Sequence, residues 1–190
     1  MPRVLNYAEV LESLTQHGLE CLYHNSGAFG FPEGMTTYSV GWLLQEDPTI
    51  RALARPMAKI VDPPVEKTLA TMAGRMWAEH LGNQLAWVMP KSHWAYELDF
   101  GNYQWLPTVM SEAGLAAESL KGRNDGSAVE FDISEQPAFE TFIERLLRHL
   151  VGSDFMVAFS GGGTICTVHS HKQLWWTTRD ATIADALQKA

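Results

Sequence analysis

Three short apolar segments separated by tight turns occupy the last third of the chain, and this arrangement restricts the fold more than any other feature. The segments are "DFMVAF", "TICTVH" and "QLWWTT", and the first turn is "SGGG" at 160–163. Strands that are joined by such short turns pair antiparallel. The pattern therefore predicts an antiparallel meander over 154–178, followed by a short helix that Asp180 caps.

The spacing of apolar residues also predicts two long amphipathic helices upstream of the meander. One begins after "DPP" (62–64) and ends at Gly82, and the other begins at Ser134 and carries apolar residues as far as Leu150. In both, the apolar residues recur at the helical period and form one face. We expect these faces to cover a sheet.

Shorter helices are predicted from their capping residues. Asn6 and Glu9 have the spacing of a capping box at the start of a helix. Asp47 and Pro48 suit the N-cap and first turn of a second short helix. A third is expected at about 103–113, where Gly114 ends it.

The segment "HWAYELDF" (93–100) alternates between two sets of residues, which predicts a strand with one solvated face. The apolar set contains Trp94, Tyr96, Leu98 and Phe100, and the other contains His93, Ala95, Glu97 and Asp99. Further strands are expected at 20–24, 35–44 and 129–133, and in "QLAWVM". Helices together with hairpins indicate an α+β fold, with an antiparallel or mixed sheet and helices mainly on one face.

Two regions share an order of elements. Residues 65–100 and 138–170 both have the predicted order helix, turn, strand, turn, strand, so two similar helix-hairpin units sharing one core are an alternative description of the fold. The length of 190 residues suits a single domain over 1–190. The most linker-like stretch lies within 119–127, where a break between two lobes is an alternative.

The composition excludes several classes of protein. Hydrophobic residues make up 46% of the chain, which is enough for a core, and the formal net charge is −8. Because nucleic acids and anionic membranes select clustered Lys and Arg, neither is an expected partner. Two cysteines far apart give no disulfide framework. With no signal peptide or membrane span visible, we expect a soluble cytoplasmic protein.

The histidines of "CTVHSHKQLWW" (166–176) are candidate metal ligands. His169 and His171 share one face if the strand is continuous, whereas Cys166 has the opposite parity. A divalent metal would then need a third ligand from elsewhere, such as Glu97 or Asp99. The alternative is that 170–172 form a hairpin turn and that both histidines are ordinary surface residues.

Glu97 and Asp99 form a second candidate site. Two carboxylates at alternate positions of a strand can bind a cation or act in acid–base chemistry. The alternative is that they line the solvated side of an antiparallel sheet.

Aromatic residues supply the candidate binding residues. The loop "HNSGAFGFPEG" (24–34) combines glycines with His24, Asn25, Phe29 and Phe31, although its phenylalanines could equally anchor the loop to the core. Seven tryptophans are a high number for 190 residues. Trp175 and Trp176 are adjacent, so in a strand one faces the core and the other faces outward.

No run of residues matches a catalytic motif with its spacing intact, since both GxSxG and HExxH are absent. No cofactor is evident, apart from the divalent metal considered above. We therefore expect a non-enzymatic protein-binding or regulatory module, whose partner is a protein, a basic one among the alternatives, or a second copy in a homodimer. The alternatives are a small metal-dependent hydrolase using His169 and His171 with a carboxylate, and a small-ligand sensor.

Overall fold

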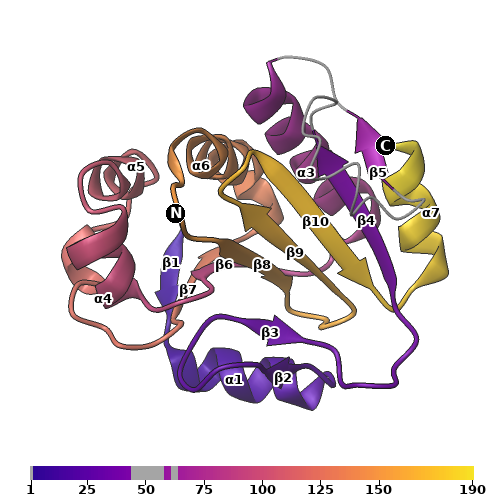
Figure 1. Cartoon of the computed structure of the whole chain (residues 1–190), viewed down its shortest axis with the longest axis horizontal. Coiled ribbons are helices and arrows are strands. Elements are labelled where there is room, and N and C mark those ends of the chain that lie inside the picture. Colours follow the sequence, from indigo (N-terminus) through magenta and orange to yellow (C-terminus); the bar gives the residue numbers. More distant parts are fainter. Residues whose placement is uncertain (1, 44–57, 61–63) are drawn as a thin grey trace.

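A mixed β-sheet forms the centre of the molecule. The computed structural model describes residues 2–43, 58–60 and 64–190. Within these residues the sheet has eight strands in the order β1-β7-β6-β8-β9-β10-β4-β5 (Figure 1). All neighbours are antiparallel except β4 and β5, which run parallel. In sheet order the strands are Arg3–Leu5, Ala128–Phe131, Ala86–Pro90, Phe155–Phe159, Thr164–His169, Gln173–Thr178, Tyr38–Leu43 and Ala58–Ile60.

Helices and a small hairpin surround this sheet. The α-helices are α1 (Tyr7–Gln16), α3 (Val65–His80), α4 (Trp94–Tyr96), α5 (Leu106–Glu112), α6 (Gln136–His149) and α7 (Ala181–Lys189). The short helical turns are a π-helical turn at Glu97–Gly101 and 3₁₀ turns at Ala117–Ser119 and Ile133–Glu135. The hairpin pairs β2 (Glu20–Cys21) with β3 (Phe29–Gly30).

Each face of the sheet has its own apolar core. Helices α3, α6 and α7 cover one face, where their side chains pack with those of Val88, Val157 and Trp176. Helix α1 and the β2–β3 hairpin lie on the other face, over Trp87 and Met156 (Figure 1). The α+β class is therefore confirmed.

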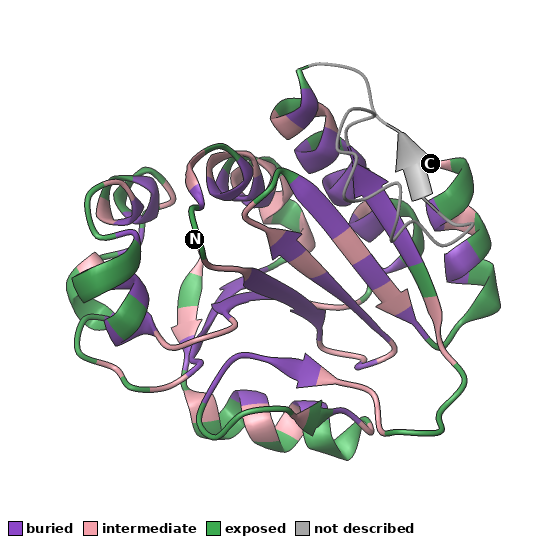
Figure 2. Cartoon of the chain, in the orientation of Figure 1, coloured by how far each residue is buried: buried purple, intermediate pink, exposed green. Residues whose placement is uncertain are grey.

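The two central strands explain why both faces are covered. Every residue of β6 and β8 is buried, as the purple ribbons of Figure 2 show. A strand of continuous apolar residues exposes side chains to water on any face that is left open, because consecutive side chains point to opposite faces. Burial on both faces thus follows from the sequences "AWVMP" and "FMVAF".

Most elements lie where the sequence predicts them. The meander is formed by β8, β9 and β10, and the capping box of Asn6 and Glu9 begins α1. The long helices are α3 and α6. The short helix expected after Asp47 and Pro48 lies outside the described residues. No helix among the described residues is long and apolar enough to cross a membrane.

The predicted strand at 93–100 is wrong, because this segment is helical. Trp94 and Leu98 are both buried, and a separation of four residues places two side chains on one side of a strand and also of a helix. The charge of Glu97 suggested a solvated position, yet its side chain is buried. Burial of Ala95 and Glu97 beside Trp94 and Leu98 follows the helical period.

The prediction of two similar helix-hairpin units is consequently wrong, because the unit at 65–100 has a helix where its second strand was expected. What the two regions share is a helix followed by a strand, α3–β6 and α6–β8. The two helices pack together, and the two strands are antiparallel neighbours. The sheet joins β1 to β7, so strands from both sides of 119–127 belong to it. This stretch therefore does not separate two sheets.

Helix α7 provides a test of capping. The Asp180 carboxylate accepts hydrogen bonds from the backbone N–H groups of Thr182, at 2.7 Å, and Ile183, at 3.4 Å. We expect Asp180→Ala to lower the free energy of unfolding by about 0.5–2 kcal/mol, because two N–H groups lose their acceptor. Asp185→Ala, on the exposed side of the same helix, is the matched control, and urea unfolding measures both. Equal losses would contradict this role of the cap.

Candidate functional site

The segment 94–105 forms the candidate site, and Trp94 anchors it to the core. The indole N–H of Trp94 donates to the Ser127 carbonyl oxygen at 2.5 Å, and its ring meets Phe155 edge to face at 5.7 Å. The backbone N–H groups of Trp94 and Ala95 donate to carbonyl oxygens of the adjoining 123–127 loop. Leu98, one turn later, is buried as well. One side of the segment is thus fixed to the protein.

The opposite side of this segment presents aromatic rings to solvent. Phe100 is 81% exposed, Tyr103 55% and Tyr96 46%. We call these three residues the aromatic surface. Asp99 lies among them in sequence and is also exposed. Exposed apolar residues that lie within one short segment, unlike single ones spread over the chain, favour a site of interaction.

A buried polar network lies beneath the aromatic surface. The Glu97 carboxylate accepts hydrogen bonds from the Ser92 hydroxyl and the Asn102 side-chain amide, both at 2.5 Å. The Asn102 backbone N–H donates to the Glu97 carbonyl oxygen at 2.6 Å, five residues back. This i→i+5 bond defines the π-helical turn, a feature that is frequent at functional sites. Asn102 thus holds Glu97 by its backbone and by its side chain.

Two neighbours extend the network. The Asn102 amide also donates to the Ser153 hydroxyl at 2.8 Å, and the Trp105 indole N–H donates to the Asn102 amide oxygen at 3.1 Å. Trp105 in turn stacks on the His149 ring, with centroids 5.3 Å apart. The turn that carries Phe100 is therefore linked to α6 and to the loop before β8.

Gly101 leaves the space that this arrangement needs. A Cβ atom at position 101 would lie 3.1 Å from the Glu97 carboxylate and 3.5 Å from the Tyr96 ring. The first of these separations is tighter than ordinary van der Waals contact. A side chain at this position would therefore press on the polar network from the side of the aromatic surface.

The two predicted carboxylates do not share a face, because the segment is not a strand. Glu97 is buried in the network, whereas Asp99 is exposed beside Phe100. The sequence reasoning also missed the aromatic surface. The sequence does contain a signal for it, because Tyr96, Phe100 and Tyr103 have the helical spacing i, i+4, i+7. Tyr96 and Phe100 also fit the alternation of a strand, and the segment is therefore predicted as a strand.

His169 and His171 lie together at the β9–β10 turn, which spans 170–172 as expected. Their rings stack with centroids 5.0 Å apart. The Nδ1 atom of His169 accepts the His171 backbone N–H at 3.2 Å, and its Nε2 atom lies 3.7 Å from the Asp154 carboxylate. Both ring nitrogens of His169 thus face groups of the protein itself.

The described residues contain no group of three or more His, Cys, Asp or Glu side chains that could hold a metal. Glu97 and Asp99 belong to α4 and the turn that follows it, and the two histidines belong to the β9–β10 turn. The metal site suggested by the sequence stays a prediction without a third ligand among these residues.

The two adjacent tryptophans face opposite sides of β10, as expected. Trp176 is 1% exposed and packs against Trp42 and Phe159, so no partner reaches it on the surface. Trp175 is half-buried, and its ring lies over Gly41, where a Cβ atom would approach it to 2.7 Å. Five of the seven tryptophans are core residues. The tryptophan excess therefore mainly serves packing.

Some residues of the loop at 24–34 are buried in the core and others are exposed. Phe29 is 1% exposed and packs with α1, and Phe31 is half-buried beneath the Arg179 guanidinium, 5.7 Å from the ring centroid. His24 and Asn25 are exposed. Phe29 thus anchors the loop, which was the alternative to a binding role for this residue.

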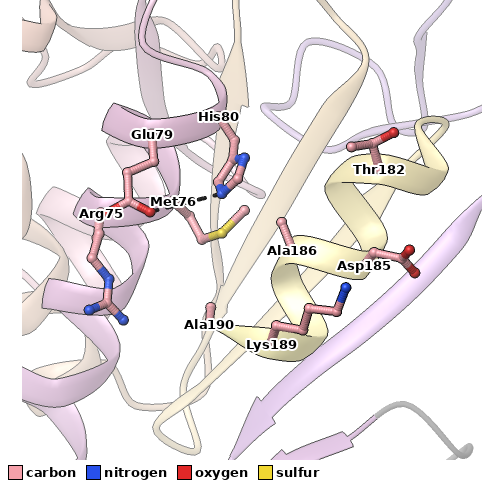
Figure 3. A pocket seen from close by; sticks show the side chains of 9 residues that line it. All are labelled: Arg75, Met76, Glu79, His80, Thr182, Asp185, Ala186, Lys189 and Ala190. Carbon is pink, nitrogen blue, oxygen red and sulfur yellow. Dashed lines mark ion pairs between the residues drawn. The ribbon is translucent and has the colours of Figure 1, made fainter.

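A pocket of about 510 Å³ lies between α3 and α7 (Figure 3). Met76 and Ala186 supply apolar surface, and charged side chains of both signs surround them. Arg75, Glu79, Asp185 and Lys189 are all exposed. A ligand site usually directs a few polar groups inward from an apolar lining. The charges here lie on open helix surface, so the pocket is a weaker candidate than the aromatic surface.

No family model, curated protein or solved structure matches this chain.

The polar network predicts a difference between two variants of Glu97. Glu97→Ala removes the acceptor of two polar side chains, and each buried group left unsatisfied costs about 1–3 kcal/mol. Glu97→Gln can accept from Asn102 and donate to Ser92, so we expect it to lose less than half as much stability. Urea unfolding measures both, and similar losses would show that the hydrogen bonds of Glu97 contribute little.

The histidine pair predicts a dependence on pH. Burial lowers the pKa of His169 below its usual 6.5, His171 and Lys91 act in the same direction, and the Asp154 carboxylate opposes them. Because the folded protein then binds this proton less readily than the unfolded chain, this residue's contribution to stability falls as pH drops below 6.5. NMR titration of the ring should give a midpoint below 6.5, and Asp154→Asn should lower it further. A midpoint above 6.5 would contradict the assignment.

Proposed function

We propose that this protein is a non-enzymatic protein-binding module that contacts its partner through the aromatic surface. The observation that carries the proposal is the exposure of Phe100, at 81%, beside Tyr96 and Tyr103 on a segment whose other side is anchored in the core. Aromatic residues on a fixed backbone lose little conformational entropy on binding, which favours them as interface anchors.

The size of this surface suits the centre of an interface. An aromatic side chain buries about 150–250 Å², so the exposed fractions of the three rings correspond to roughly 270–450 Å² in total. A standard interface buries about 800 Å² on each partner, with aromatic residues in its core and a polar rim. The aromatic surface therefore accounts for about a third to a half of one side.

The charge of the chain favours a basic partner. Asp99 is exposed and directly precedes Phe100 in the chain, and the formal net charge is −8. Complementary charge accelerates association and excludes partners of like charge. These properties also disfavour nucleic acid.

The two alternatives have less support. A metal-dependent hydrolase needs ligands that converge on one ion, and His169 is hydrogen-bonded within the protein instead. A small-ligand sensor could use the pocket between α3 and α7, but the charged side chains around it are exposed.

Photo-crosslinking tests the proposal in two steps. A benzoylphenylalanine at position 103, in cells of the source organism, should capture a partner that mass spectrometry identifies. The purified partner should then bind the Phe100→Ser variant about tenfold more weakly, or worse, as truncation of an interface anchor requires. A crosslinked product of twice the chain mass in the purified protein would identify the partner as a second copy.

Met35→Ser is the control for surface hydrophobicity. Met35 is 37% exposed and lies on the segment between β3 and β4, away from α4 (Figure 1). This variant should bind the partner as the wild type does. Equal binding by wild type and Phe100→Ser, or no crosslinked partner at all, would overturn the proposal.

A further inference from the structure

We propose that the aromatic surface binds an arginine-rich segment of the partner, with guanidinium groups stacked on the rings of Tyr96, Phe100 and Tyr103 and paired with Asp99. This inference rests on the proposed function and specifies the chemistry of the partner. It follows from the kind of side chains that this surface exposes, and from the charges around them.

The carboxylate of Asp99 favours a cationic partner. It directly precedes Phe100, it is exposed, and the part of the chain that the structure describes gives it no ion pair. A carboxylate in that position favours an incoming cation, whereas a purely apolar partner would have to desolvate it without compensation. An apolar groove or helix is thus a poorer fit.

The exposed rings favour arginine over other cations. An aromatic face attracts a cation that lies within about 6 Å of its centroid, and arginine does so more often than lysine. The planar guanidinium can stack on a ring and donate to a carboxylate at the same time, which the ammonium group of lysine cannot do in one plane. Three exposed rings with one carboxylate among them therefore favour arginine over lysine.

The same contact occurs inside this protein. The Arg179 guanidinium lies 5.7 Å from the centroid of the half-buried Phe31 ring. There the chain supplies both partners. Among the described residues, no such contact involves Tyr96, Phe100 or Tyr103.

Arg123, a cation near α4, is held by other bonds and does not stack on these rings. Arg123 lies on the loop that adjoins α4, but its guanidinium donates to the Ser119 carbonyl oxygen at 2.9 Å and to the Ser127 hydroxyl at 3.2 Å. These bonds hold it on the loop. Arg145 of α6 lies 3.5 Å from the Glu112 carboxylate, so it is paired within the protein too.

Calorimetric titration with two peptides tests the inference. The full-length protein at physiological ionic strength is titrated with octa-arginine and with octa-lysine, which carry the same charge. Because an exposed cation–π contact changes affinity roughly two- to fivefold, we expect octa-arginine to bind about tenfold more tightly through several such contacts. Equal affinities, or no binding of either peptide, would overturn the inference.

Variants locate the preference on the molecule. Phe100→Ser keeps the net charge, so it should remove most of the preference for arginine and lower the affinity for octa-lysine by a smaller factor. Asp99→Asn should weaken octa-arginine binding more than Asp185→Asn does. The second variant removes the same charge from the exposed side of α7. A preference for arginine that survives Phe100→Ser would place it elsewhere and overturn the inference.

The two proposals fail in different ways. If Phe100→Ser weakens binding of the captured partner while the two peptides bind equally, the aromatic surface is an interface and its preference for arginine is refuted. If Phe100→Ser leaves the captured partner's affinity unchanged, the proposed function itself fails, whatever the peptides do.

Discussion

Burial of the two central strands on both faces is the constraint on which the rest of this structure depends. Strands β6 and β8 have no exposed residue, so each face of the sheet must be covered. Helices α3, α6 and α7 cover one face, and α1 with the β2–β3 hairpin covers the other. Most of the tryptophans are needed for this packing. The rings that remain exposed on the 94–105 segment are therefore of interest, because no part of the core accounts for them.

The 94–105 segment shows how one stretch of chain serves both the core and the surface. Trp94 and Leu98 are buried, while Tyr96 and Phe100 are exposed. The π-helical turn inserts an extra residue, and the Glu97–Asn102 pair holds it. Burying a carboxylate is costly unless its hydrogen bonds are satisfied. Here two side chains satisfy them, so the network offsets the cost of burial and fixes the backbone that presents Phe100.

The fold followed from local signals wherever these were unambiguous. The meander, the two long helices and the caps at Asn6 and Asp180 depend on turn residues, apolar period and side-chain hydrogen bonds between near neighbours. The prediction failed at 93–100, because Trp94 and Leu98 satisfy the periods of a strand and of a helix alike. The same error displaced the candidate site, since it placed Glu97 beside Asp99 on a solvated face and hid the spacing of the exposed rings.

The sequence by itself determined the α+β class, the order of most elements and the negative charge, because these follow from composition and from contacts between residues close in the chain. Only the tertiary structure decided that Glu97 is buried, that Trp176 belongs to the core and that Phe100 is exposed. The physical reason is that burial depends on partners distant in sequence. Ser153, which bonds Asn102, and Phe155, which packs on Trp94, each lie more than fifty residues along the chain from the residue that they contact.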